Sequence, residues 1–267
     1  MEVKQYLKPT SLEEAYQHLI KEANNHLIGG GMWIKNTLKS VDTLIELNDL
    51  VLGSVIESPK ILTIGSMTTL RQLEIDPAIS CLGNGLLSKS AQSIMGVTLR
   101  NAATIGGTIV GGYAFSDLIP ALLVLDAMLV FYKQGRISLS DYLAMEVKPK
   151  DILISVEIKK HECEGYFHKV ANTALDFAIL NVAILKCKSG FRIAVGSRPG
   201  IATLSKKAMN YLSKAKELSS EVINQAVQMV IEELPFGSNF RASAEYRQEI
   251  ASVYLKRGLQ EVMSHAS

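Results

Sequence analysis

The sequence has few cysteines and histidines, and none of them has the spacing of metal ligands. Cys81, Cys163 and Cys187 are scattered, and no pair has the C-x-x-C spacing of iron–sulfur or structural zinc sites. The five histidines form no ligand pattern either. We therefore expect buried free thiols, as in a reducing cytosol, and no metal site on this chain. If the protein handles electrons, another subunit must carry the metals.

The chain also lacks a strong excess of one charge and a long uncharged apolar run. Its 28 Lys and Arg residues against 26 Asp and Glu residues give a net charge of +2 without a basic block, which favours neither a nucleic-acid nor a membrane partner. The longest apolar stretch contains Pro120 and Asp126, and the first residues do not resemble a signal peptide. We expect a soluble, cytoplasmic protein. Its 267 residues suffice for one large domain or two smaller ones.

Glycine, by contrast, is concentrated in two clusters. Gly29-Gly30-Gly31 lies near the N-terminus, and Gly106-Gly107 lies between Thr104 and Thr108. Glycine lets the backbone approach a ligand closely, and successive N–H groups in a turn can line a phosphate, with the threonine hydroxyls as further donors. A plain turn between core elements is the alternative for a single glycine pair. Two such clusters favour an anion-binding site, although neither has the Rossmann or P-loop pattern.

The sequence after the second cluster predicts a buried helix. Ser116 or Asp117 is suited to the N-cap, and Pro120 is tolerated in a first turn. The residues that follow, through Met128, are apolar on nearly every face.

Local patterns predict an alternation of helices and short strands over the rest of the chain. Ser11 and Glu14 fit a capping box at the start of the first helix. β-branched runs and turn residues place the strands. The predicted strands are residues 26–28, 43–47, 61–64, 128–131, 136–139, 152–158, 166–170, 178–186 and 191–195, and the further helices are residues 68–75, 220–233 and 243–264.

In their order along the chain, these motifs resemble the FAD-binding subunits of molybdenum hydroxylases, the family of xanthine dehydrogenase and carbon monoxide dehydrogenase. Ile28-Gly29-Gly30-Gly31-Met32-Trp33 is similar to the first flavin loop, A-G-G-[TS]-x-L. The stretch from Arg100 to Thr108 is similar to the second, R-N-x-[AS]-T-[IL]-G-G-N. Similar to further family motifs are S-D-L-x-P at residues 116–120, L-x-A-L-D-A at 122–127, F-x-K and D-[IF]-A within 167–178, and S-x-x-Y-R at 243–247.

The resemblance implies an α+β fold with two domains. A two-lobed, PCMH-type FAD-binding domain like that of vanillyl-alcohol oxidase would occupy residues 1–158, with lobes of about 1–55 and 56–158. A smaller α+β domain of the CO dehydrogenase flavoprotein type, with an antiparallel sheet and helices, would occupy residues 165–267. The charged run at residues 159–165 would separate the two.

The resemblance also implies a function and a set of contacts. The chain would be an FAD-dependent, xanthine or purine dehydrogenase-like oxidoreductase subunit. It would pass electrons from an iron–sulfur subunit, which works with a molybdopterin-binding subunit, through FAD to NAD or another acceptor. The glycine loops would hold the pyrophosphate, Ser116 and Asp117 would bind polar atoms, Ile94 and Ile154 would pack near the rings, and Lys169 would approach the isoalloxazine. The implied cofactor-binding residues are Leu27, Ile28, Gly29, Gly30, Gly31, Met32, Trp33, Ile94, Thr104, Ile105, Gly106, Gly107, Thr108, Ser116, Asp117, Ile154 and Lys169, with no catalytic residue and no metal ligand.

Several alternatives stay open at this point. Gly31 and Thr108 depart from the family pattern, so a subunit that has lost its flavin and only bridges partners is one alternative. A stand-alone flavin oxidoreductase, like the cell-wall enolpyruvyl reductases, is another. Lys169 is alternatively a solvated lysine on an edge strand, and Asp117 a simple helix cap.

Overall fold

The structure, a computed structural model, describes residues 1–37, 40–215 and 217–264. Its contacts divide the chain into two compact units that each draw on separate stretches of sequence. Unit 1 consists of Met1–Gln72, Gly96–Gly111 and Ala127–Ile158, and unit 2 of Leu73–Met95, Gly112–Asp126 and Lys159–Ser267. The continuous domains expected at residues 1–158 and 165–267 stay a prediction.

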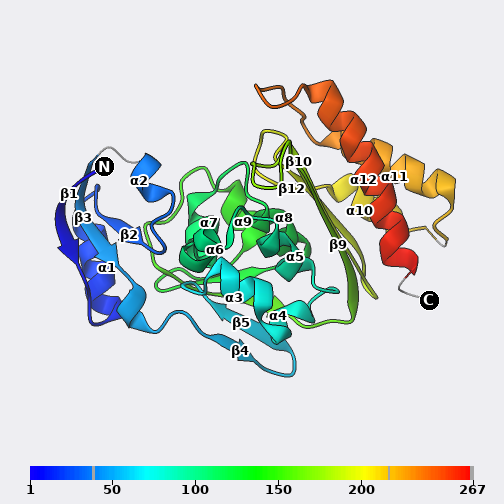
Figure 1. Cartoon of the computed structure of the whole chain (residues 1–267). Helices are drawn as coiled ribbons and strands as arrows, with labels where there is room; N and C mark the ends of the chain where they lie inside the picture. Colours follow the sequence, from blue (N-terminus) through cyan, green and yellow to red (C-terminus); the bar gives the residue numbers. More distant parts are fainter. Residues whose placement is uncertain (38–39, 216, 265–267) are drawn as a thin grey trace. The chain divides into compact units, whose positions relative to one another are not determined.

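Unit 1 contains two sheets with short helices around them (Figure 1). The first sheet has the parallel order β1-β3-β2, and the second has the order β4-β5-β8-β6-β7. In chain order, the strands and helices are β1 (Glu2–Leu7), α1 (Leu12–Lys21), β2 (His26–Ile28), α2 (Ile34–Thr37), β3 (Ser40–Glu46), the 3-10 helix η1 (Asn48–Leu50), β4 (Val55–Glu57), β5 (Ile61–Gly65), α3 (Leu70–Ile75), which ends in unit 2, α6 (Val97–Ala102), α7 (Ile105–Gly111), β6 (Met128–Phe131), β7 (Gly135–Ser138), α9 (Leu139–Ala144) and β8 (Leu153–Lys159).

Helix α1 begins where its capping residues predict. Ser11 accepts a hydrogen bond from the Glu14 N–H at 3.1 Å. The Glu14 carboxylate accepts from the Thr10 N–H at 2.7 Å, one residue before the partner expected for a capping box. Ala15 and Leu19 on this helix share a buried cluster with strand β3, and this packing fixes α1 on the parallel sheet.

Unit 2 contains an antiparallel sheet, in the order β12-β11-β10-β9, and most of the longer helices. Helices α11 and α12 confirm the predictions for residues 220–233 and 243–264 to within one residue. The elements are α4 (Pro77–Ser80), α5 (Leu86–Gln92), α8 (Leu118–Val124), β9 (Cys163–Val170), β10 (Leu180–Cys187), β11 (Gly190–Gly196), β12 (Thr203–Leu204), α10 (Lys206–Leu212), α11 (Ser220–Glu233) and α12 (Ala244–Ser264).

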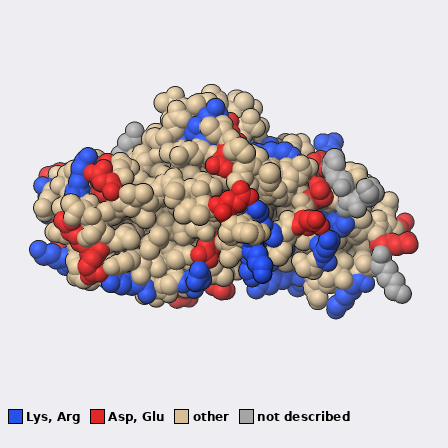
Figure 2. Space-filling view, turned by 90° about the horizontal axis from the view of Figure 1, so that it is seen from below, with Lys and Arg blue, Asp and Glu red and all other residues tan. Residues whose placement is uncertain are grey.

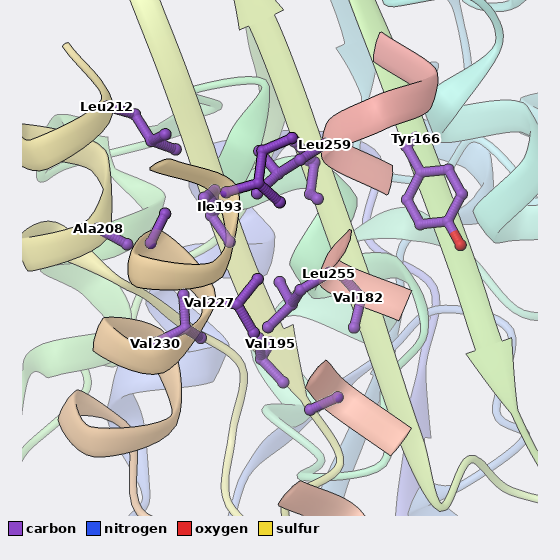
Figure 3. Packing of buried hydrophobic residues seen from close by; sticks show 14 of the residues in the cluster. Tyr166, Val182, Ile193, Val195, Ala208, Leu212, Val227, Val230, Leu255 and Leu259 are labelled. Carbon is purple, nitrogen blue, oxygen red and sulfur yellow. The ribbon is translucent and has the colours of Figure 1, made fainter. Parts of the chain in front are cut away.

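The core of unit 2 lies between the sheet and helices α10, α11 and α12. Figure 3 shows how Val182, Ile193 and Val195 on the strands meet Leu255 and Leu259 on α12. Each of these side chains is at most 1% exposed. Full burial of such a side chain contributes roughly 1.5–3 kcal/mol, so this face holds the helices on the sheet.

Arg247 gives the S-x-x-Y-R motif a structural role. Its guanidinium is buried and donates hydrogen bonds to the backbone carbonyls of Ile179, Gly237 and Ala242 and to the Asn239 side chain, at 2.6–2.9 Å. A buried arginine with satisfied donors ties the start of α12 to two loops.

The cysteine expectation is wrong for two of the three thiols. Cys163 on β9 lies directly opposite Cys187 on β10, and the two form a disulfide. Cys81 is free, and it is exposed rather than buried. The disulfide was missed because it depends on the strand register, which brings together two cysteines that are 24 residues apart in sequence.

The helix after Ser116 is buried as expected but shorter than predicted. Helix α8 ends at Val124, and Asp126 has a positive φ of 54°. Met128 already belongs to strand β6, which pairs with β7 and β8. Because Met128 pairs in the sheet, the helix ends earlier than its apolar pattern predicts.

The surface carries charges of both signs on the face shown in Figure 2. No helix in the part of the chain that the structure describes is long and apolar enough to cross a membrane.

Gly258 on α12 tests how tightly the helix packs on the sheet. An added Cβ would lie 2.3 Å from Tyr166 Cδ1 and 2.8 Å from Ile184 Cδ1. Overpacking of this kind costs about 1–3 kcal/mol, against a gain of about 1 kcal/mol in helix propensity. We expect Gly258→Ala to lower the free energy of unfolding in urea. Gly200→Ala, whose added methyl meets no atom within 4 Å, is the control, and equal stability of the two variants would contradict this packing.

Candidate functional site

The first glycine loop packs directly on the chain that leads from α6 to α7. A Cβ at Gly30 would lie 1.6 Å from the Ala102 carbonyl oxygen, and one at Gly29 would lie 2.7 Å from Thr104 Oγ1. The backbone contact excludes any side chain at Gly30, and a side chain at Gly29 would force the Thr104 side chain to shift. The two glycine clusters, more than 70 residues apart in sequence, therefore meet within unit 1.

The second glycine cluster is helical and does not form the expected open turn. Gly106 and Gly107 lie in the first turn of α7, where Thr104 Oγ1 accepts the Gly107 N–H at 3.1 Å. The N–H groups of Ile105 and Gly106 donate to the carbonyls of Thr68 and Ser66, and that of Thr108 donates to the Thr104 carbonyl. These donors are already paired and cannot line a phosphate in this conformation.

The first glycine loop, unlike the second, has backbone N–H groups without an acceptor in the described part of the chain. Among the described residues, the backbone N–H groups of Gly30, Gly31 and Met32 donate none of the hydrogen bonds found in the structure. Gly31 has a φ of +68°, a left-handed conformation that favours glycine at this position. Of the two glycine clusters, the first therefore has N–H groups that are available to an anion, at residues 30–32.

Two apolar side chains adjoin the loops. Ile154 on β8 and Met67 pack on the same buried cluster as Leu27, which precedes the first loop. The Ile154 carbonyl accepts a hydrogen bond from the Ser66 N–H at 2.8 Å. Unit 1 contains one part of the predicted site residues, namely Leu27, Ile28, Gly29, Gly30, Gly31, Met32, Trp33, Thr104, Ile105, Gly106, Gly107, Thr108 and Ile154.

The other predicted residues, Ile94, Ser116, Asp117 and Lys169, belong to unit 2. Lys169 Nζ lies 3.0 Å from Asp117 Oδ2 and donates to the Ser93 carbonyl, next to Ile94, at 2.9 Å. The two charged side chains are only 9% and 6% exposed. The reading of Lys169 as a solvated lysine is therefore wrong.

Asn181 completes this polar cluster. Its Nδ2 donates to the Ser116 carbonyl at 3.1 Å and to Asp117 Oδ1 at 3.0 Å. Asp117 occupies the N-cap position of α8, as expected, but its side chain makes no cap bond to the described helix, whereas Ser116 Oγ accepts the Ile119 N–H. Burial raises the pKa of the Asp117 carboxyl, and the charge of Lys169 and the Asn181 hydrogen bond oppose that shift.

Several residues of these clusters were not predicted. Ser66, Met67 and Thr68 lie between β5 and α3, and Ser93 and Asn181 hold the polar cluster of unit 2. A weak signal was present, since three hydroxyl residues, Ser66, Thr68 and Thr69, directly follow an apolar strand. Among the described residues, no group of three or more His, Cys, Asp and Glu could hold a metal ion.

Comparison with known proteins assigns both parts of the chain. Residues 1–159 match the family of the FAD binding domain in molybdopterin dehydrogenase. Residues 165–262 match the CO dehydrogenase flavoprotein C-terminal domain.

Relatives extend over nearly the whole chain. The chain is 29% identical to the uncharacterized protein YgfM of Escherichia coli over 94% of its length and 93% of the relative. It is 23% identical to the putative xanthine dehydrogenase FAD-binding subunit XdhB of Escherichia coli, over 98% and 96%. A chain of carbon monoxide dehydrogenase from Hydrogenophaga pseudoflava has the same fold, with a TM-score of 0.89, 22% identity and 97% coverage of both chains.

These matches agree with the meeting of the two glycine clusters in unit 1, and they show the family that the motifs resemble. The chain belongs to the FAD-binding subunits of the molybdenum hydroxylase family, and it is an FAD-dependent oxidoreductase subunit.

Proposed function

We propose that this subunit passes electrons from the iron–sulfur clusters of a partner through FAD to NAD or another acceptor, within a xanthine or purine dehydrogenase-like complex. An iron–sulfur subunit and a molybdopterin-binding subunit are the proposed partners, and the cytoplasm is the proposed location. Bound FAD supplies the electron chemistry, and the protein positions and tunes it. The observation that carries the proposal is the junction of the two glycine clusters in unit 1.

The groups at this junction fit a flavin dinucleotide. The N–H groups of Gly30, Gly31 and Met32 have no acceptor among the described residues, which suits an anionic pyrophosphate. Thr104 Oγ1 accepts the Gly107 N–H and keeps its own proton for a ligand acceptor. The Thr108 hydroxyl was expected to donate to a phosphate, but it donates to the Thr104 carbonyl at 2.9 Å and is not free.

Gly107 offers the sharper test of the junction. It is exposed, and an added Cβ would meet only Thr104 Oγ1, at 3.1 Å. A Cβ at Gly106 would lie 2.7 Å from the Ser66 carbonyl oxygen, so a substitution at Gly106 disturbs the fold itself.

We expect Gly107→Ala to weaken FAD binding at least about tenfold, because its methyl blocks backbone approach, while helix propensity holds or raises the stability of the apoprotein. Flavin content and apoprotein melting temperature are the measurements. Gly53→Ala, whose added methyl makes ordinary contacts at 3.8–4.0 Å, is the control in unit 1. Unchanged flavin content in a folded Gly107→Ala protein would reject the assignment of this loop.

The proposed complex is tested by purification of the tagged chain from its own host. We expect flavin absorption together with an iron–sulfur polypeptide and a molybdopterin-binding polypeptide. Flavin on a chain that purifies alone would favour a stand-alone oxidoreductase, and partners without flavin would favour a bridging subunit.

Lys169 is proposed to tune the flavin, as the resemblance implies. A cation stabilises anionic reduced flavin, so Lys169→Met is expected to lower the reduction potential, by about 30 mV for each 1.4 kcal/mol of interaction lost in a two-electron couple. Asp117→Asn is expected to raise it, because it removes the opposing charge. Potentiometric titration at matched pH and salt measures both shifts, and Lys169→Arg is the charge-conserving control.

Stability measurements distinguish the predicted shifts in reduction potential from damage to the fold. Lys169→Met leaves the Asp117 carboxyl buried without its cation, which costs about 3–5 kcal/mol where the group stays ionised. The Lys169→Met/Asp117→Asn protein is expected to recover much of that loss. Coincident midpoint potentials in all variants would remove Lys169 from the flavin chemistry.

A further inference from the structure

Two buried hydroxyls in unit 1 have no hydrogen-bond partner in the described part of the chain. Ser66 is 3% exposed and Thr68 is 0% exposed, and neither Ser66 Oγ nor Thr68 Oγ1 has an acceptor or donor among the described residues. Buried side-chain oxygens in folded proteins are almost always bonded, because an unpaired one has lost its water without replacement. Two such atoms two residues apart indicate a partner outside the folded chain.

These hydroxyls lie beside the second glycine cluster. The Ser66 carbonyl accepts the Gly106 N–H at 2.8 Å, and the Thr68 carbonyl accepts the Ile105 N–H at 3.0 Å. A Cβ at Gly106 would lie 2.9 Å from Ser66 Cβ, so the serine side chain sits against that glycine. The backbone carbonyls of this segment accept hydrogen bonds from α7, while its two hydroxyls are available to a ligand.

Apolar groups flank the same segment. Met67 lies between the two residues in sequence, and its sulfur is 3.7 Å from a Cβ position at Gly29. Ile154, whose carbonyl accepts the Ser66 N–H, packs with Met67 on one buried cluster. Hydroxyl donors beside apolar side chains and a glycine loop suit a ligand with both a flat apolar face and polar oxygens.

We propose that Ser66 and Thr68 are FAD-binding residues whose hydroxyls hydrogen-bond the adenosine diphosphate half of the cofactor. The inference rests on the proposed FAD site at the glycine junction. A hydroxyl donates to phosphate, ribose or ring-nitrogen acceptors alike. The adenosine diphosphate half is favoured because the same segment also adjoins the first glycine loop, whose N–H groups suit the pyrophosphate: the Met67 sulfur lies 3.7 Å from a Cβ position at Gly29.

The site has a thermodynamic signature. In the apoprotein each hydroxyl is buried and unsatisfied, so its removal does not cost a hydrogen bond and relieves the penalty of desolvation. In the FAD complex the same hydroxyl is satisfied, and its removal weakens binding. Substitution should therefore move apoprotein stability and cofactor affinity in opposite directions.

The experiment uses Ser66→Ala and Thr68→Val in the full chain. We expect the urea midpoint of each apoprotein to stay the same or rise, and the Kd for FAD, measured by flavin fluorescence, to rise about tenfold. The Kd for ADP should rise by the same factor. Thr43→Val is the control, since Thr43 is also buried in unit 1 but its hydroxyl is bonded to Gln5 at 3.5 Å, and it should lower stability without changing either Kd.

Two results would overturn the proposal or part of it, and a third would distinguish its failure from failure of the proposed function. Unchanged FAD and ADP affinities with a lower apoprotein midpoint would mean that the hydroxyls hold a buried water. A loss of FAD affinity without a loss of ADP affinity would reject the adenosine diphosphate half. If the wild type binds ADP but no FAD, the proposed function fails, whereas weaker ADP binding by Thr68→Val would still support this site.

Discussion

The contact between Gly30 and the Ala102 carbonyl is the constraint on which the arrangement of unit 1 depends. A Cβ at Gly30 would lie 1.6 Å from that oxygen, so the end of β2 can reach the segment before α7 only with glycine at this position. That approach places the loop after β2 beside Thr104, and Thr104 in turn caps α7. The glycines of this family pattern thus serve backbone packing first, and ligand contact follows from the packing.

Hydrogen bonds decide which groups are left for a ligand. The N–H groups at the start of α7 are bonded to Thr104 and to the carbonyls of Ser66 and Thr68. Bonding of this kind makes the second glycine cluster rigid before any cofactor binds, and it removes the donors that a glycine motif alone would suggest. Within the described part of the chain, the N–H groups of residues 30–32 and the hydroxyls of two buried side chains have no partner. A rigid site with free donors lowers the ordering cost of binding.

Sequence alone predicts the parts of this fold that depend on local pattern. The helix predicted at residues 220–233 is α11, and the strands predicted at 178–186 and 191–195 form the β10–β11 hairpin. Local sequence patterns did not predict features that depend on contacts between distant segments. The Cys163–Cys187 disulfide needs the strand register, and helix α7 forms across two glycines because the Ser66 and Thr68 carbonyls accept its first N–H groups. The motifs located the candidate site, whereas the partners of its residues come from the tertiary structure.

The buried ion pair of Lys169 and Asp117 in unit 2 is not explained by stability alone. A buried ion pair stabilises a fold little, since a well-packed apolar pair of similar volume is often as good or better. Lys169 and Asp117 are nevertheless both nearly fully buried, with Asn181 and Ser93 supplying further hydrogen bonds. The charge that Lys169 is proposed to supply to the flavin would account for an arrangement that stability alone does not favour. Because burial raises the pKa of Asp117, protonation occurs at a higher pH than for an ordinary aspartate, and the cluster then carries the positive charge of Lys169 without compensation. The field of this cluster therefore becomes more positive as the pH falls through that pKa.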